Sequence, residues 1–291
     1  MSTGLNTSEE KREHLDIYAI FEGPQELYFG DRVQINVNLV EQITLESADG
    51  TQIKKCYISP TKRRGVERRS LIWAPTNTGA LLGDVRECGI PKTCVKQDCP
   101  ICAIYGAMDA GNSTLIGRLT HGGGVAIQAL PPEEKQRAMH PALIARKNEE
   151  SPTPFRREYN EPGLLYPNSN HFLSVTEKEF TAGAYAFLDS LARVGAGNPK
   201  GVKLFEKDNQ PMLIVDRYLS PMGKRPILSP HISDTKQAIE TFERLARTVH
   251  GKLYKENTIK MERFERKIGD DALVYLQTCA DQFVQDHLQG S

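Results

Sequence analysis

The sequence predicts an α+β protein with an antiparallel sheet at its core. Strand-like segments come first, a helix separates them from further strands, and two helices end the chain. Across residues 31–47, apolar residues at 33, 35, 37 and 39 alternate with polar ones, which is the period of a half-buried strand. A turn at 48–50 and a second strand at 51–59 complete a predicted hairpin. This order favours a ferredoxin-like core with insertions.

The middle of the chain contains a well-marked helix. Thr176 and Glu179 are spaced as a capping box, and the helix is predicted to end near Val194. Its apolar face consists of Phe180, Ala184, Phe187, Leu188 and Leu191. Beyond a glycine-rich break, residues 202–206 and 212–219 are predicted strands, and amphipathic patterns predict two C-terminal helices at 239–249 and 273–284.

We expect one domain over residues 1–291, with three distinct segments. Residues 86–110 form a cysteine-rich insertion, and residues 232–291 form a C-terminal helical part. The segment 131–170 is rich in proline, arginine and asparagine, which is typical of a long loop or insertion.

The composition is that of a soluble globular protein. Of 291 residues, 39% are hydrophobic and 25% are charged, and no run of apolar residues is long enough to span a membrane. The N-terminus lacks the basic and apolar regions of a signal peptide, so we expect a cytoplasmic protein that does not bind a membrane.

The charge is unevenly distributed along the chain. Residues 1–50 hold 10 acids and 3 bases, a net charge of −7, whereas residues 51–70 hold 7 bases and 1 acid, a net charge of +6. A polyanion would therefore meet a local basic strip although the whole chain is formally neutral.

Four of the six cysteines are close in sequence, with the spacing Cys88-x5-Cys94-x4-Cys99-x2-Cys102. Zinc takes four thiolates in a tetrahedral arrangement, and the C-x2-C pair supplies two from one tight turn. The alternative is that these are ordinary thiols packed at the start of a helix. A redox role for "CPIC" ranks lower, because no βαβ unit surrounds it. The sequence thus predicts either a structural Zn²⁺ site or free thiols.

The basic strip is predicted to be a loop between a strand and a helix. It carries Lys62, Arg63, Arg64, Arg68 and Arg69. The planar guanidinium of arginine forms bidentate hydrogen bonds with phosphate. Tyr57 and Trp73 flank the strip as possible stacking surfaces for bases. Thr76, Asn77 or Thr78 is expected to cap the following helix, whose N-terminus can receive a phosphate. The alternative is a solvated surface loop.

Two weaker features complete the candidate site residues. In "LARVGAGNPKGVKL", glycines and Asn198 expose backbone amides to an anion, with Arg193, Lys200 and Lys203 supplying charge. A helix end followed by a hairpin loop explains this turn equally well. His121 precedes three glycines and is the one histidine in a setting that suggests a general base, although a turn histidine is more common.

The order of these motifs resembles a known family. A proline-opened segment "WAPTNTGALLGDVREC" is followed by "CPICAIYG", and this combination is similar to the RAMP superfamily of CRISPR-associated proteins. The stretch "GLLYPNSNHFLSVTEKEFTAGAYAFLDSLARVGAGNPKGVKL" resembles the guide-RNA-binding backbone subunit of that superfamily. The resemblance covers roughly residues 15 to 220 and favours a type I or type IV-like subunit.

The resemblance implies a modified RNA-recognition-motif fold with palm, fingers and thumb. The cysteine segment would be a finger and 131–170 a thumb-like insertion. Copies would polymerise along guide RNA, hold its phosphates and present its bases to a target, which we expect to be DNA, together with other effector-complex subunits in a prokaryotic cytoplasm. The implied RNA-binding residues are Lys62, Arg63, Arg64, Arg68, Arg69, Thr76, Asn77, Thr78, Arg193, Asn198 and Lys200.

The resemblance implies no catalytic residue, and two alternatives from other classes stand beside it. One is an endoribonuclease that processes repeat RNA, for which only His121 or His14 is available as a general base. The other is a zinc-stapled protein-interaction module that does not bind RNA.

Overall fold

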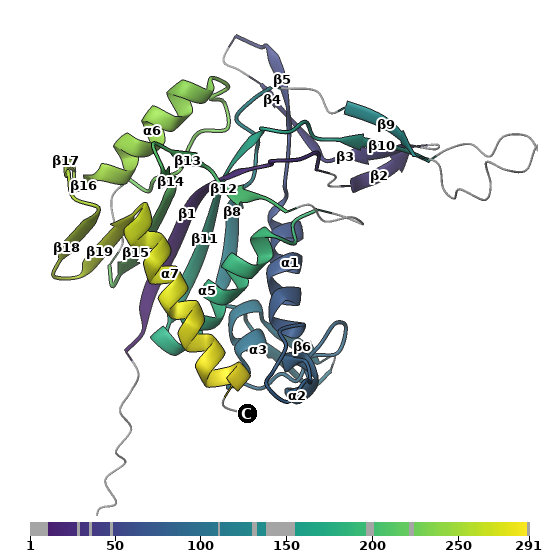
Figure 1. Cartoon of the computed structure of the whole chain (residues 1–291), viewed down its shortest axis with the longest axis vertical. Helices are drawn as coiled ribbons and strands as arrows, with labels where there is room; N and C mark the ends of the chain where they lie inside the picture. Colours follow the sequence, from purple (N-terminus) through teal and green to yellow (C-terminus); the bar gives the residue numbers. More distant parts are fainter. Residues whose placement is uncertain are drawn as a thin grey trace, which may run out of the picture.

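The centre of the protein is a twisted antiparallel sheet (Figure 1). The computed structural model describes residues 11–27, 30–34, 37–46, 49–109, 111–129, 133–137, 155–195, 201–220 and 224–289. The strand order is β18 (Thr258–Met261), β19 (Phe264–Ile268), β15 (Leu213–Tyr218), β1 (Glu13–Glu22), β11 (Leu165–Val175) and β8 (Leu119–Gly123), and β12 (Lys203–Leu204) also pairs with β1. These pairings are all antiparallel, which confirms the predicted α+β fold class.

Helices cover one face of the sheet. They are α1 (Pro60–Ile72), α3 (Pro100–Tyr105), α5 (Glu177–Leu191) and α7 (Asp270–Phe283). The predicted capping box of α5 is confirmed, because Thr176 Oγ1 accepts the Glu179 amide at 3.1 Å and the Glu179 carboxylate accepts the Thr176 amide at 2.9 Å. Gly183 lets α5 approach the sheet closely, since a Cβ there would lie 2.3 Å from the Phe172 ring.

The opposite face packs against α6 (Thr235–Arg247). Tyr18, Ile20 and Ile214 from the sheet meet Phe242 and Ala246 of this helix in a second apolar cluster. The two C-terminal helices are therefore confirmed, but β18 and β19 between them belong to the central sheet. The C-terminal part is accordingly mixed rather than purely helical.

Of the strand predicted across residues 31–47, only β4 (Gln42–Glu46) pairs with β5 (Gln52–Cys56) in the predicted hairpin. Residues 33, 37 and 39, whose alternation helped to predict that strand, belong instead to 30–34 and 37–40, which form two other strands that pair with each other. A separate four-stranded sheet contains β2 (Gly30–Gln34), β3 (Val37–Val40), β10 (Phe155–Tyr159) and β9 (Glu133–Arg137). Residues 165–170 of the predicted 131–170 insertion lie in β11, so the insertion is shorter at that end than predicted. Residues 138–154 lie outside the described part of the chain.

Several short elements complete the fold. They are α2 (Leu82–Val85), β6 (Ala107–Asp109), β7 (Ser113–Leu115), β13 (Glu206–Lys207), β14 (Gln210–Pro211), β16 (Thr248–Val249), β17 (Lys252–Leu253) and the π-helix Val284–Gln289. Among the described residues, no helix is both long and apolar enough to cross a bilayer.

Two local predictions were wrong. The basic strip is not a loop but the helix α1, which begins with Pro60 in its first turn and consists mostly of residues that tolerate a helix well. The helix after it, α2, is preceded by Leu81 at the N-cap position and not by Thr76, Asn77 or Thr78, because those three residues lie in an earlier turn.

Candidate nucleic-acid interface and metal site

Helix α1 presents five basic residues and one acidic residue on three different faces. Residues three, four or seven apart share a face of a helix. Lys62, Arg69 and Trp73 therefore form one row, Arg63 and Glu67 a second, and Arg64 and Arg68 a third. The three rows have different roles in the structure.

The row of Arg63 and Glu67 is buried against the sheet. Arg63 donates hydrogen bonds to the Asn170 side chain at 3.3 Å and to the Gly122 carbonyl, and its burial lowers the pKa of its guanidinium to about 10. Both bonds bind α1 to the central sheet. Arg63 was a predicted RNA contact, but here its guanidinium lies inside the protein and positions the helix.

Glu67 is the centre of a buried polar group. Its carboxylate lies 2.8 Å from Nε2 of His121 and accepts hydrogen bonds from the Tyr105 hydroxyl at 3.1 Å and the Asn170 amide at 3.0 Å. Burial alone would raise the pKa of Glu67, but His121, Asn170 and Arg63 outweigh it and hold the pKa below its ordinary value. The sequence prediction did not include Glu67, and its position as the one acid in a basic segment was the only available signal.

The third row contains Arg64, whose guanidinium donates to two backbone carbonyls, and Arg68, two of whose guanidinium nitrogens have no acceptor in the part of the chain that the structure describes. Arg64 donates to the Leu119 carbonyl at 3.0 Å and to the Tyr105 carbonyl, which joins α1 to β8 and α3. Nε and Nη2 of Arg68 are buried and have no hydrogen-bond partner among the described residues. Buried guanidinium nitrogens are normally paired, so Arg68 has capacity for an additional acceptor.

The remaining row, Lys62, Arg69 and Trp73, faces outward. Trp73 is 56% exposed, and the Arg69 guanidinium lies 6.0 Å from the centre of its ring. Lys62 is partly exposed, and its Nζ lies 2.6 Å from Oε2 of Glu41 in an ion pair. A pocket of about 230 Å³ borders this row and is lined by Ile58, Thr61, Lys62, Arg63, Gly65, Val66, Arg69, Val194 and Gly195. The lining combines apolar side chains, including Val66 and Val194, with the cationic side chains of Lys62 and Arg69.

The pocket joins two features that are far apart in the sequence. Val194 and Gly195, at the beginning of the glycine-rich turn, lie beside α1. Arg193 forms a two-pronged ion pair with Asp189, at 2.5 and 2.9 Å, and remains exposed. The other two predicted residues of this turn, Asn198 and Lys200, lie outside the described residues.

The turn of Thr76, Asn77 and Thr78 is stabilised from within the protein. Thr76 Oγ1 donates to the Ala80 carbonyl at 2.8 Å and lies 2.9 Å from the Thr78 hydroxyl. Asn77 donates its side-chain amide to the Gln289 carbonyl at 2.7 Å. The turn therefore closes on itself and on the C-terminal π-helix, while the Asn77 and Thr78 residues stay exposed.

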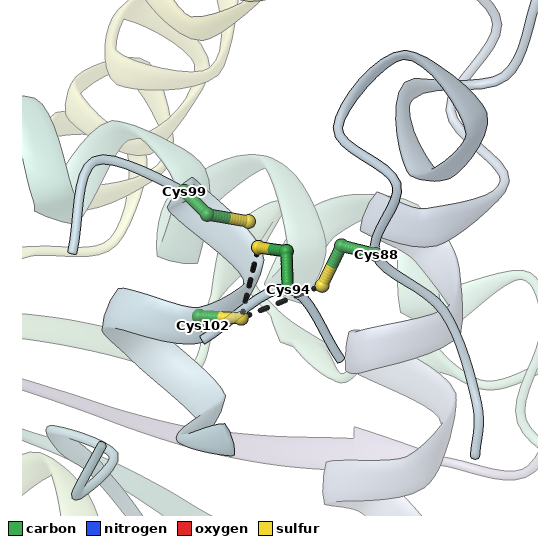
Figure 2. Close-up of side chains that lie close together, drawn as sticks. All are labelled: Cys88, Cys94, Cys99 and Cys102. Carbon is green, nitrogen blue, oxygen red and sulfur yellow. Dashed lines mark hydrogen bonds between the residues drawn. The ribbon is translucent and has the colours of Figure 1, made fainter. Parts of the chain in front are cut away.

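The four predicted zinc ligands come together in space (Figure 2). Cys88 follows α2, Cys94 lies in the next loop, and Cys99 and Cys102 open α3. Their sulfurs all lie within 4.8 Å of one another, with 3.4 Å between Cys88 and Cys102 and 3.6 Å between Cys94 and Cys102. Four sulfurs at about 2.3 Å from one ion would lie roughly 3.8 Å apart. The cluster could therefore hold a metal ion, and it is the only such group among the described residues.

Comparison with known proteins gives a limited result. No protein-family model matches the chain, and no curated protein matches it. Solved structures do match. The chain is similar to a structure titled "Type IV-B CRISPR Complex", with 14% identity, a TM-score of 0.38, and coverage of 78% of this chain and 98% of that chain. It is also similar to Csc2 of Thermofilum pendens, with 16% identity, a TM-score of 0.41, and coverage of 84% and 73%.

These two solved structures share 14% and 16% of their residues with the chain, so the likeness concerns the fold alone. Because the identities and scores are low, the function proposed below rests on the chain's own residues.

Proposed function

We propose that this chain is a non-catalytic RNA-binding subunit of a CRISPR effector complex. In this proposal it holds guide RNA by its backbone, and copies assemble along the RNA with other effector subunits, so that the bases can pair with a DNA target. The observation that supports RNA binding most directly is the outward row of Lys62, Arg69 and Trp73. This row lies beside a pocket that is lined partly by apolar side chains.

This row has the two components that single-stranded RNA requires. Cations follow the phosphates, and an exposed aromatic ring stacks with a base without reading its identity. Nε and Nη2 of Arg68 are buried, so Arg68 is not assigned to the phosphate contacts of the folded chain. The RNA-binding row would thus consist of Lys62, Arg69 and Trp73, with Arg63 and Arg64 positioning the helix.

Among the other predicted contacts, Asn77 and Thr78 lie just beyond Trp73, and Arg193 directly precedes Val194 and Gly195 at the pocket. We retain Asn198 and Lys200, which lie outside the described residues, as proposed RNA contacts. We propose that the four cysteines bind one structural Zn²⁺ ion, which would fix α3 and the loop before it beneath α1. The ion would hold the fold of this segment and take no part in a reaction.

Trp73 provides a direct test, because it is the only tryptophan in the chain. We expect its fluorescence to be quenched as single-stranded RNA is added to the full-length protein. Because Trp73→Ala removes the fluorophore, the affinities of the variants are compared by the anisotropy of labelled RNA. Arg69→Glu should weaken binding, and Trp73→Ala should reduce the binding free energy by about 1–3 kcal/mol, which is the range for one base stacked on an aromatic ring. Arg263→Glu, an exposed arginine on the opposite edge of the sheet, is the matched control and should bind like wild type.

Salt dependence separates phosphate contacts from stacking. For single strands, each phosphate contact contributes about 0.7 to the slope of log affinity against log salt. Arg69→Glu should reduce that slope by at least this amount, whereas Trp73→Ala should leave it unchanged. Wild-type protein that shows no quenching, or an Arg69→Glu variant indistinguishable from Arg263→Glu, would overturn the proposal.

A further inference from the structure

We propose that the cluster of Cys88, Cys94, Cys99 and Cys102 is coupled to the RNA-binding row, so that bound Zn²⁺ strengthens RNA binding and bound RNA strengthens zinc binding. Tyr105, the last residue of α3, is the positioning residue that links the two sites. This inference rests on the proposed function and deepens it, because it makes the metal a determinant of RNA affinity as well as a support for the fold.

The cysteine segment touches α1 at two places, and the first contact is made by Tyr105. Its hydroxyl donates to the Glu67 carboxylate at 3.1 Å, and its backbone carbonyl accepts a hydrogen bond from Arg64. The Arg64 guanidinium also lies 5.7 Å from the centre of the Tyr105 ring. Because Tyr105 and Glu67 are both buried, their hydrogen bond is shielded from water. These contacts hold the end of α3 against the middle of α1.

The second contact is at the C-terminal end of α1, directly before Trp73. A Cβ at Gly83 of α2 would lie 2.8 Å from the Ile72 carbonyl oxygen and 2.8 Å from the Cys88 carbonyl oxygen. The three backbones therefore meet with no room for a side chain between them. The Cys88 amide also donates to the Gly83 carbonyl at 2.8 Å. The first cysteine of the cluster is thus packed through α2 against the residue that precedes Trp73.

A metal ion would join these two contacts. Cys102 lies in α3 three residues before Tyr105, so the two side chains are on one side of that helix. The Sγ atoms of Cys88 and Cys102 are 3.4 Å apart, close enough for one ion to bind both (Figure 2). Without the ion, α3 and Cys88 would be connected by the loop of residues 89–98 and by side-chain packing. The ion would therefore close a brace that holds α1 at its middle and at its end.

The position of α1 determines the geometry of the RNA-binding row. Lys62 lies in the first turn of α1, Arg69 in its last turn and Trp73 directly after it, so phosphates and a stacked base must be met by one helix at the same time. RNA that binds a helix already fixed in place loses less conformational entropy than RNA that must order the helix first. By linkage, RNA must then raise the affinity of the cysteine cluster for zinc by the same factor.

Reciprocal affinities measure this coupling in the full-length protein. The affinity for a fluorescein-labelled single-stranded RNA is determined by anisotropy with zinc-loaded and with chelator-stripped protein. The affinity for Zn²⁺ is determined against a competing chelator, with and without saturating RNA. We expect Zn²⁺ to raise the RNA affinity about tenfold, which is within the usual range for coupled sites, and RNA to raise the zinc affinity by the same factor.

Two buried tyrosines distinguish coupling from general stability. Tyr105→Phe keeps the ring and removes the hydrogen bond to Glu67, and we expect it to lower the coupling factor by about threefold. Tyr166→Phe is the matched control, because it removes the hydroxyl that accepts the Asn160 amide at 2.9 Å in another part of the core. Both variants should lower the melting temperature, but Tyr166→Phe should keep the coupling factor of wild type.

The outcomes separate this inference from the proposed function. Equal RNA affinities of zinc-loaded and zinc-free protein, or a protein that takes up no zinc and still binds RNA, would refute the coupling and leave RNA binding intact. Zinc binding without RNA affinity would overturn the proposed function and this inference with it. A coupling factor that is unchanged in Tyr105→Phe, or lowered equally in Tyr166→Phe, would show that the two sites communicate only through overall stability and would overturn the role of Tyr105.

Discussion

Nε2 of His121 lies 2.8 Å from the Glu67 carboxylate, and this contact joins β8 to α1 beneath the basic surface. The two side chains are only 2% and 3% exposed. Tyr105 and Asn170 donate to the same carboxylate, so three segments of the chain meet at one buried acid. Because each partner is removed from water, the group stabilises the fold only while all of its members are present.

We therefore expect Glu67→Gln to destabilise the protein by about 3 kcal/mol, since it leaves Arg63 buried without its nearest counter-charge. The measurement is the free energy of unfolding in urea. Glu262→Gln, at a highly exposed glutamate, should change it by no more than about 0.5 kcal/mol. Equal effects of the two substitutions would show that the buried group contributes little.

The same carboxylate makes stability depend on pH. The pKa of Glu67 in the folded protein lies below its ordinary value of 4.5, because His121 and Asn170 outweigh the effect of burial. A carboxyl with a lowered pKa contributes stability that is present above 4.5 and is lost as the pH falls through the folded value. Below pH 4.5, wild type should lose more stability than Glu67→Gln, as thermal unfolding at several pH values would reveal.

The position of His121 also bears on the ribonuclease alternative. A general base must reach the proton that it removes, and a side chain enclosed by Glu67 cannot do so without local opening. We expect His121→Ala to lower the melting temperature and to leave the outcome of incubation with repeat RNA unchanged. Wild-type cleavage that disappears in His121→Ala, at a temperature where both proteins are folded, would show that the chain is an enzyme.

The central strand β1 has no counterpart in the sequence prediction, and the reason is its burial. Leu15, Ile17 and Phe21 face the helices, while Tyr18 and Ile20 face α6. A strand covered on both faces shows no alternation of polar and apolar residues, which was the signal that predicted strand structure at residues 33–39. The capping box of α5, by contrast, depends on residues three positions apart and is visible locally.

In the candidate site, too, the features that depend on local spacing were predictable from the sequence, and those that depend on distant partners were not. The cysteine cluster was predictable because the C-x2-C spacing is itself local, whereas the roles of the arginines were not. Arg63 meets Asn170 across 107 residues, and Glu67 meets His121 across 54. Nothing in a run of charges indicates which members will be turned inward by such distant partners, so the helix appeared as a loop and its buried arginines as RNA contacts.

Metal removal should affect one segment of the protein selectively. If Zn²⁺ holds the four cysteines, a chelator should expose the segment around Cys88, Cys94, Cys99 and Cys102 to limited proteolysis before the rest of the chain, because the ion would join the loop before α3 to α3 itself. Metal analysis should give one ion per chain. Cys99→Ser should abolish binding, and Cys279→Ser, at a buried cysteine outside the cluster, should retain it. Full metal content in Cys99→Ser would contradict the assignment.

The final prediction concerns the ion pair that attaches α6 to the sheet. Arg266 binds both oxygens of Asp216 at 2.6 Å and donates to the carbonyls of Leu245 and Ala246 in the last turn of α6, where the Leu245 carbonyl also accepts the Thr248 amide. Asp216→Asn removes the counter-charge of Arg266. It should lower the free energy of unfolding by about 3–5 kcal/mol, because the Arg266 guanidinium is completely buried.

A double-mutant cycle then separates the cost of the unpaired charge from the value of the pair. Replacing both partners, as Asp216→Leu with Arg266→Met, should restore much of the stability, since apolar residues of similar size often match a buried ion pair. The Ala246 carbonyl would lose its Arg266 donor in the double variant, so recovery should be incomplete. A double variant as unstable as the sum of its single variants would mean that the two residues act independently, and that the ion pair does not hold α6 in place.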